Sequence, residues 1–300
     1  GSGVASLNVT RRGAIGFCLK QAGITMRDVD WIYSPLKTYT NYTQRLTEYF
    51  KYQFGHSPNI ELYDHHLCHA ASSFYGSGFS EATVACFDFS GDSSSGLVAH
   101  ARGNDFRVLT RFGRNNSLGL YYGMLTQYLG YQMTNDEYKV MGLSSYGSPD
   151  YLDKFAKLLR PNGINYELDP ELDKRRRDAE IFTSDFSTRQ ERIFTEKMEE
   201  ILGPRRLRGQ PLDQRLTDIA ASGQKQLEIV TTEVIRTAIA ETGCGDVCVA
   251  GGVGLNCKMN MEIAAEPSVK RLYVPPVPHD AGVALGAAMM KCAEAGHAIA

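Results

Sequence analysis

The sequence predicts an α/β fold in which short apolar strands alternate with helices. Strand-like runs at residues 60–63, 246–250 and 271–275 are each followed by a helical pattern, and residues 83–112 divide into three strands joined by short turns. With 300 residues, 43% hydrophobic and 22% charged, the chain is long enough for one large core or two smaller ones. Chemistry in such folds is expected where strands end and helices begin.

The charge balance and hydropathy of the chain exclude several classes of protein. There are 32 basic and 34 acidic residues, so a net charge of -2 gives no general attraction to nucleic acid or to an anionic membrane. No apolar run is long enough to span a bilayer and the N-terminus lacks the pattern of a signal peptide, so we expect a cytoplasmic protein. The seven cysteines have apolar neighbours, which indicates reduced thiols packed in a core.

The first 80 residues are expected to form one unit of the fold. A helical pattern covers Ala14–Ala22, residues 29–33 form a strand, and a second helix is expected from Asn41 to about Phe54. The strand at residues 60–63 then leads into a helix that begins with the sequence Asp64-His65-His66-Leu67-Cys68-His69.

Three histidines lie within five positions of this helix. His65 and His69 stand one turn apart on the same face, where both imidazoles can bind one metal ion. The alternative is a helix face with two hydrogen-bonded histidines and no metal, because His-x-x-x-His also arises by chance and a four-coordinate site needs further ligands. The spacing alone does not decide between the two.

An acidic residue ends the first of the three strands expected between residues 83 and 112. Asp88 is followed by Ser90, Gly91 and further small polar residues. The backbone amides of this loop can approach a phosphate while the carboxylate holds a cation. The alternative is a polar hairpin turn that binds nothing, and that is the commoner structure for such a sequence.

Residues 148–211 differ in composition from the rest of the chain. They carry alternating acids and bases and the basic run Lys174-Arg175-Arg176-Arg177, and we interpret them as a largely solvated helical insertion or lid. No aromatic residues are interleaved with the basic run, which favours an exposed surface over a nucleic-acid site. Before this segment, a buried helix is expected from Ser117 to Gly130. Lys139 can contact a ligand phosphate, although an exposed lysine on a helix face is the commoner case.

Two strand-to-helix junctions in the C-terminal part of the chain are candidate ligand sites. The strand at residues 246–250 leads into Gly251-Gly252-Val253-Gly254-Leu255-Asn256, and a glycine-rich turn before a helix is a binding site for phosphate or a nucleotide. The strand at residues 271–275 leads to Asp280 at the start of a helix over residues 283–295. There Asp280 can face a cation, cap the helix, or do both.

Seven segments, in this order, resemble the O-carbamoyltransferases of the nodulation and antibiotic pathways, the family of the tobramycin and cephamycin carbamoyltransferases. They are residues 64–74 (DHHLCHAASSF), 87–95, 117–122, 137–147 (EYKVMGLSSYG), 220–227, 250–257 (AGGVGLNC) and 280–288 (DAGVALGAA). The resemblance spans most of the chain. It implies an actin/Hsp70/sugar-kinase-like fold in its universal tRNA-modification branch, with two ribonuclease-H-like halves and a nucleotide between them. Residues 1–80 would form the first half, truncated because the family's opening strand hairpin is missing, and residues 81–300 the second.

The same resemblance implies a ligand set. The metal, iron or another divalent ion such as zinc, would be bound by His65, His69, Asp88 and Asp280, with His66 in a supporting role. The adenosine part of ATP or carbamoyl adenylate would be held by Gly251, Gly252, Gly254 and Asn256. Further nucleotide contacts are expected from Glu137, Lys139, Ser90 and Gly91.

The implied activity is ATP-dependent transfer of a carbamoyl group from carbamoyl adenylate to a hydroxyl of a natural-product or sugar-like acceptor. Carbamoyl phosphate would be the carbamoyl source in the whole enzyme, whose adenylate-forming C-terminal domain, or an equivalent chain, is an expected partner. No nucleic acid or membrane partner is expected. Two alternatives stay open. One is a small-molecule kinase of the same superfamily, which would need Asp88 but neither His65 nor His69, and the other is a non-catalytic module that binds nucleotide and metal.

Overall fold

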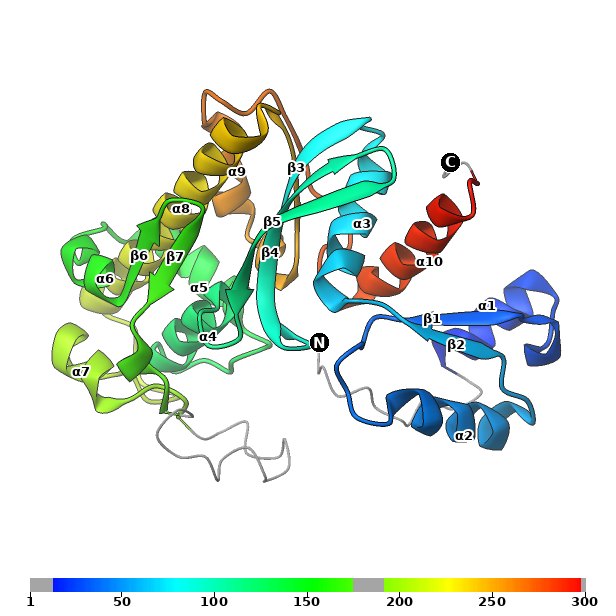
Figure 1. The fold of residues 1–300 in the computed structure, drawn as a ribbon. Coiled ribbons are helices and arrows are strands. Elements are labelled where there is room, and N and C mark those ends of the chain that lie inside the picture. The colour runs from blue at the N-terminus through cyan, green and yellow to red at the C-terminus, as the bar shows by residue number, and fades with distance from the viewer. Residues whose placement is uncertain (1–12, 175–191, 298–300) are drawn as a thin grey trace.

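A five-stranded sheet forms the centre of the computed structural model, which describes residues 13–174 and 192–297 (Figure 1). The strand order is β5-β4-β3-β8-β9. The first three are antiparallel neighbours, as the sequence predicts, whereas β8 runs parallel to β3 and β9 parallel to β8. Their bounds are β3 (Glu81–Gly91), β4 (Ser94–Arg102), β5 (Asp105–Gly113), β8 (Asp246–Ala250) and β9 (Arg271–Tyr273).

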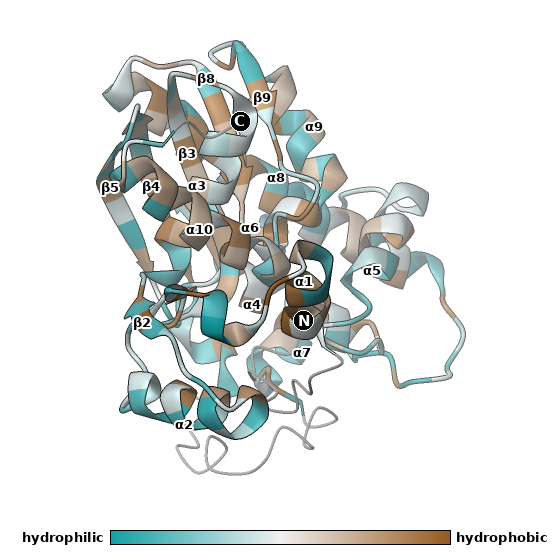
Figure 2. Ribbon diagram, turned by 90° about the vertical axis from the view of Figure 1, so that its right-hand side faces the viewer, coloured by the Kyte–Doolittle hydropathy of each residue, from teal (hydrophilic) through white to brown (hydrophobic). Residues whose placement is uncertain are grey.

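Helices cover both faces of this sheet because successive side chains of β3 point to opposite sides. On one face of β3, Val84 packs with Phe74 of α3. On the other face, Phe87 packs into a larger core. Strands β3 and β8 are drawn largely in the brown of hydrophobic residues (Figure 2). The first side is covered by α3 (His65–Ser77), on which α10 (Val283–Glu294) packs in turn. The second side is covered by α4 (Leu118–Tyr128), α8 (Gln214–Thr242) and α9 (Cys257–Ala265).

A smaller unit precedes α3. Its strands β1 (Trp31–Ser34) and β2 (Asn59–Leu62) pair in parallel, and its helices are α1 (Ala14–Ala22) and α2 (Tyr42–Phe54). Its own cluster is formed by Met26, Tyr42, Leu46 and Phe50. The unit is attached to α10, because the hydroxyl of Tyr63 donates to Glu294 at 2.8 Å and Lys291 lies 3.5 Å from Glu61.

Most of the expected elements appear with small shifts at their ends. One such shift is in the hairpin between β3 and β4, where the expected turn over residues 91–95 narrows to two residues. Gly91 and Ser94 still pair, because Asp92 adopts a left-handed backbone with φ of 52° and closes the turn tightly. Strand β1 begins two residues later than the expected start at Val29.

In the described residues 148–174 and 192–211, part of the segment that we expected to be helical and largely solvated is instead a hairpin with buried side chains. Between α6 and α7 the chain forms a hairpin, and Phe155, Tyr166 and Phe194 are buried in the main core. The charged residues thus mark only the outer side of a segment whose apolar residues pack inward. The basic run, from Arg175 onward, lies outside the described residues. The remaining elements are α5 (Glu137–Leu143), α6 (Leu152–Leu158), β6 (Leu159–Asn162), β7 (Asn165–Leu168) and α7 (Glu196–Leu202).

The burial of the cysteines and the absence of a membrane span were both expected from the sequence, and the described residues can be compared with each expectation. Three cysteines are buried as expected (Cys68, Cys86 and Cys248), whereas Cys18, Cys257 and Cys292 are exposed. Cys18 has an apolar residue on each side but lies on a helix, where sequence neighbours point in different directions, so adjacent apolar residues do not predict its burial. Within the described part of the chain, no helix combines the length and the apolar character that a membrane span requires.

Candidate metal centre

The start of α3 places two imidazoles against each other. The Asp64 side chain caps this helix by accepting from the backbone N–H of Leu67 at 2.9 Å. One turn later on the same face, the Nε2 atom of His69 lies 3.2 Å from that of His65. Both side chains are buried. The expected common face is therefore confirmed.

Two carboxylates complete the cluster from distant parts of the chain. Asp88 lies in β3 where the pairing with β4 shifts register between Phe87 and Gly91, and Asp280 begins the short helix η8 (Asp280–Gly282) that leads into α10. The Nε2 atom of His65 is 3.5 Å from Asp88 Oδ2 and 3.5 Å from Asp280 Oδ1. The corresponding distances from His69 are 3.9 Å and 3.5 Å.

These four residues fit a divalent metal ion. One ligand atom from each lies within 4.8 Å of all the others. Zinc binds nitrogen and oxygen at about 2.0–2.2 Å, so tetrahedral ligand atoms stand about 3.4 Å apart. The contacts of 3.2–3.9 Å between the imidazoles and between imidazole and carboxylate have this spacing. A set of two nitrogen and two oxygen donors suits both zinc and iron.

The electrostatics of the cluster follow from burial and from its opposite charges. Burial alone would lower the pKa of His65, but Asp280 and Asp88 outweigh it and raise this pKa to about 10. Burial would raise the pKa of Asp88, yet the neighbouring imidazoles of His65 and His66 hold it well below its usual range. Without a metal, the cluster therefore keeps a proton on an imidazole between ionised carboxylates.

His66 lies beside the cluster and is fully buried. Its Nδ1 atom is 2.9 Å from the hydroxyl of Ser94, and its Nε2 atom is 3.7 Å from Asp88 Oδ2 with no hydrogen-bond partner of its own. The ring therefore contacts Asp88 without being one of the four clustered residues. This place is compatible with the supporting role predicted for His66.

A close crossing of two helices brings Asp280 to the histidines. Gly286 of α10 packs on the backbone of α3, and a Cβ atom added to Gly286 would lie 1.8 Å from the carbonyl oxygen of Cys68. Only glycine permits this approach. Since Cys68 precedes His69 and Gly286 lies six residues after Asp280, the crossing fixes ligands on both helices.

The predicted glycine loop lies next to Asp88. The loop includes the short helix η7 (Gly252–Leu255), and the N–H of Gly252 donates to Asp88 Oδ1 at 3.0 Å. The N–H of Gly251 donates to Pro278 and that of Gly254 to Gly251. These three amides are therefore used within the protein, so the expected phosphate cradle cannot rely on them.

The other predicted nucleotide contacts have local partners in the structure. The Asn256 side chain is buried, caps α9 through Met259 and exchanges hydrogen bonds with Gln224. Glu137 accepts from the N–H of Thr134, and Lys139 lies 2.8 Å from Asp136. Helix α5, which carries Glu137 and Lys139, approaches the end of the glycine loop, because Met141 and Cys257 are 3.7 Å apart through their sulfur atoms. The contact of Asn256, Glu137 and Lys139 with a nucleotide stays a prediction.

The hairpin tip contains a residue that sequence reasoning missed. Asp92 accepts from the backbone N–H of His65 at 2.9 Å and from both the N–H and the hydroxyl of Thr38 at 3.0 Å. Ser90 and Gly91, two of the predicted nucleotide contacts, lie on β3 together with Asp88, and Gly91 packs against the ring of His65. A backbone N–H partner has no signature in the sequence, so no pattern pointed to Asp92.

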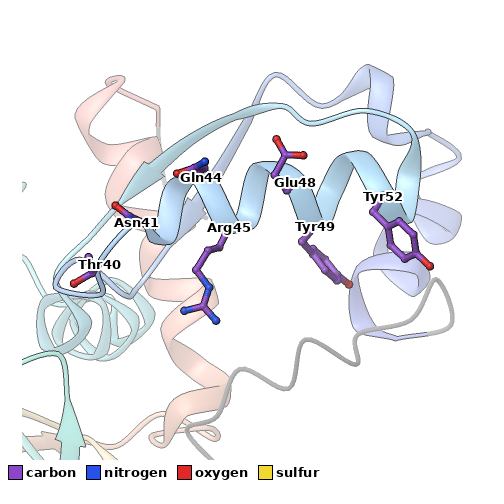
Figure 3. Close-up of a pocket in the computed structure, with 7 residues that line it drawn as sticks. All are labelled: Thr40, Asn41, Gln44, Arg45, Glu48, Tyr49 and Tyr52. Atoms are coloured by element: carbon purple, nitrogen blue, oxygen red, sulfur yellow. The ribbon is translucent and has the colours of Figure 1, made fainter.

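A surface hollow lies along α2, in the smaller unit (Figure 3). It is lined by Thr40, Asn41, Gln44, Arg45, Glu48, Tyr49 and Tyr52. None of the four clustered ligands belongs to this lining, so this hollow and the charged cluster are separate features.

Comparison with known proteins places these features in a family. A family model described as "Carbamoyltransferase N-terminus" matches residues 35–289. The nodulation protein NolNO of Sinorhizobium fredii is 32% identical over 315 residues, which cover 96% of this chain and 43% of the relative. The nodulation protein NolO of Bradyrhizobium diazoefficiens is 38% identical over 234 residues, covering 78% of this chain and 39% of the relative. The chain thus spans less than half the length of these relatives.

A solved structure gives the fold. Full-length HypF, crystallised in a phosphate- and nucleotide-bound form, superposes with a TM-score of 0.55 at 13% identity and covers 92% of this chain and 40% of its own. At this identity the likeness concerns the fold alone. It confirms the expected actin/Hsp70/sugar-kinase-like architecture.

Proposed function

The chain belongs to the family of carbamoyltransferase N-terminal domains, and we propose that it is the metal-binding transfer domain of an O-carbamoyltransferase. In this proposal a carbamoyl group passes from carbamoyl adenylate to a hydroxyl of a natural-product or sugar-like acceptor. The rest of the enzyme, or another chain, makes the carbamoyl adenylate from ATP and carbamoyl phosphate.

The observation that supports this proposal best is the double contact of Asp88. Its Oδ1 atom accepts from the glycine loop at Gly252, and its Oδ2 atom faces His65 at 3.5 Å. One buried carboxylate therefore joins the proposed nucleotide loop to the proposed metal ligands. A substrate that carries both adenosine and a transferable carbonyl needs the two sites to be adjacent.

The proposed ligands are suited to hold the reacting end of such a substrate. His65 and His69 contribute neutral nitrogen ligands once the proton on His65 has left, and Asp88 and Asp280 contribute anionic oxygen ligands. Iron, or zinc in its place, would polarise the carbamoyl carbonyl and neutralise the phosphate of the leaving group when bound. Burial of three of the four ligands limits water at this point, which favours transfer over hydrolysis.

The transfer step itself is an acyl substitution. The acceptor hydroxyl oxygen forms a bond to the carbamoyl carbon, the bond from this carbon to the phosphate oxygen breaks, and AMP leaves. The hydroxyl proton is released. The enzyme contributes chiefly by holding the acceptor hydroxyl against the face of the carbamoyl carbonyl.

Preformed carbamoyl adenylate tests the proposal without the rest of the enzyme. The wild-type chain, loaded with Fe²⁺ or Zn²⁺, is mixed with carbamoyl adenylate and simple polyols or sugars, and AMP and the carbamate ester are followed by phosphorus NMR and mass spectrometry. We expect metal-dependent ester formation that His69→Ala abolishes. The matched control is His297→Ala, an exposed histidine near the end of α10, which should leave the rate unchanged.

Two outcomes would replace the proposal. ATP-dependent phosphorylation of an acceptor that survives both His65→Ala and His69→Ala would establish the kinase alternative. Tight binding of nucleotide and metal without any ester or AMP formation would indicate a non-catalytic module.

A further inference from the structure

The tip of the β3–β4 hairpin touches the first metal-ligand candidate at two places. Asp92 accepts the backbone N–H of His65 through Oδ2 at 2.9 Å. A Cβ atom added to Gly91 would lie 2.0 Å from Cδ2 of the His65 ring, so the ring edge rests on the bare backbone of this residue. The hairpin tip therefore restrains both the main chain and the imidazole of His65.

The second oxygen of Asp92 binds another part of the molecule. Its Oδ1 atom accepts from the backbone N–H and from the hydroxyl of Thr38, each at 3.0 Å. Thr38 belongs to the loop between β1 and α2, in the smaller unit. One carboxylate thus connects that unit to the start of α3.

The backbone of Asp92 supports a specific role for its side chain. A φ of 52° is a left-handed conformation that glycine adopts freely and that most other residues adopt only at a cost in free energy. Aspartate accepts three hydrogen bonds here that glycine would lose. Its position is also distinct from that of Asp64, which caps the same helix at Leu67 and lies 3.1 Å from Arg111.

We propose that Asp92 is a positioning residue that fixes His65 in the metal-binding orientation and links this ligand to the smaller unit through Thr38. The inference rests on the proposed metal site, and it adds a residue that the ligand set alone does not include. Residues that orient metal ligands typically change metal affinity 10- to 100-fold when replaced. Asp92 is expected to fall in this range.

The first measurement needs no metal. Hydrogen exchange at single amides is compared in the wild-type chain and in Asp92→Gly, which suits the left-handed backbone and should fold. We expect exchange at the His65 amide to become at least about tenfold faster, because its acceptor is lost. The Leu67 amide, which Asp64 holds, serves as an internal control and should stay within about twofold.

The second measurement is a Co²⁺ titration followed by the visible absorption of the bound ion. Asp92→Gly should weaken Co²⁺ binding about 10- to 100-fold and change the absorption bands, since the geometry of one ligand is altered. Asp92→Asn should lie between this variant and the wild type, because it keeps one acceptor oxygen. Asp105→Asn, at the turn between β4 and β5, is the matched control and should behave as wild type.

The outcomes separate the two proposals. Unchanged exchange at His65 in both Asp92 variants would overturn the positioning role, whether or not the protein binds metal. Wild-type Co²⁺ affinity and absorption bands in Asp92→Gly would overturn it equally. A wild-type chain that binds no Co²⁺ would instead refute the metal site, while the exchange measurement still decides whether Asp92 holds His65.

Discussion

Gly286→Ala tests whether the crossing of α3 and α10 holds the metal ligands together. The added methyl group would lie 1.8 Å from the carbonyl oxygen of Cys68, whereas real Cβ contacts essentially never fall below 3.0 Å. The two helices must therefore separate by about 1.2 Å, the difference between these distances. The obstacle is backbone, so no side-chain rotation can relieve it.

This separation exceeds what a metal site tolerates. Bond lengths to a metal vary by about 0.2 Å in well-formed sites. Asp280 precedes α10 and His69 lies on α3, so an opening of 1.2 Å should remove at least one ligand and weaken metal binding about 10- to 100-fold. Overpacking of this kind should also destabilise the fold by about 1–3 kcal/mol.

The assay combines isothermal titration with Zn²⁺ or Co²⁺ and thermal unfolding of the metal-free chain. Gly142→Ala is the matched control, since Gly142 also lies within a helix and a Cβ atom there would have open space. That variant should bind metal as the wild type does and unfold at the same or a slightly higher temperature. Gly286→Ala with wild-type metal affinity would refute the claim that this crossing positions Asp280 and His69.

Three further predictions concern the same region. Asp88→Asn should lose metal binding but keep the glycine loop in place, because an amide oxygen can still accept from Gly252. Asp88→Ala should lose metal binding and also loosen the loop. Faster amide exchange at Gly252 in both variants would contradict the difference expected between them. Asn256→Ala should lower the free energy of unfolding by about 1–3 kcal/mol, since it removes a buried helix cap. A change below about 0.5 kcal/mol in urea unfolding would contradict the role of Asn256 as the cap of α9. Metal affinity should rise between pH 6 and 8. The two carboxylates outweigh burial and raise the pKa of His65 to about 10, so a proton must leave before this imidazole binds the ion. Titration calorimetry in buffers of different ionisation enthalpy should detect this proton, and binding without proton release would contradict the assignment of His65 as a ligand.

The proximity of the candidate ligands could be predicted from the sequence where local geometry decides it. His65 and His69 share a face because the helical period brings residues four apart together. Asp88 lies in the irregular last part of β3 and Asp280 starts the short helix before α10, the kind of place where α/β folds gather functional groups. The resemblance to a family then selected these two carboxylates from the many in the chain.

Other features depend on contacts between distant segments. Thr38 and Asp92 are 54 residues apart, and the groups they use include backbone N–H atoms that every residue possesses. Gly286 contacts a carbonyl oxygen of α3, which has no sequence signature either. The hairpin β6–β7 was missed for a related reason. It is short, and its buried Tyr166 and Leu168 stand among charged residues that favoured a solvated segment.

The metal content of the purified chain tests the central claim most directly. The wild-type protein and its His69→Ala variant would be loaded with Fe²⁺ under anaerobic conditions, or with Zn²⁺, desalted, and analysed for metal per chain by mass spectrometry. The account predicts about one ion per wild-type chain and almost none in His69→Ala. A wild-type chain without metal, or a variant that keeps one ion, would contradict it.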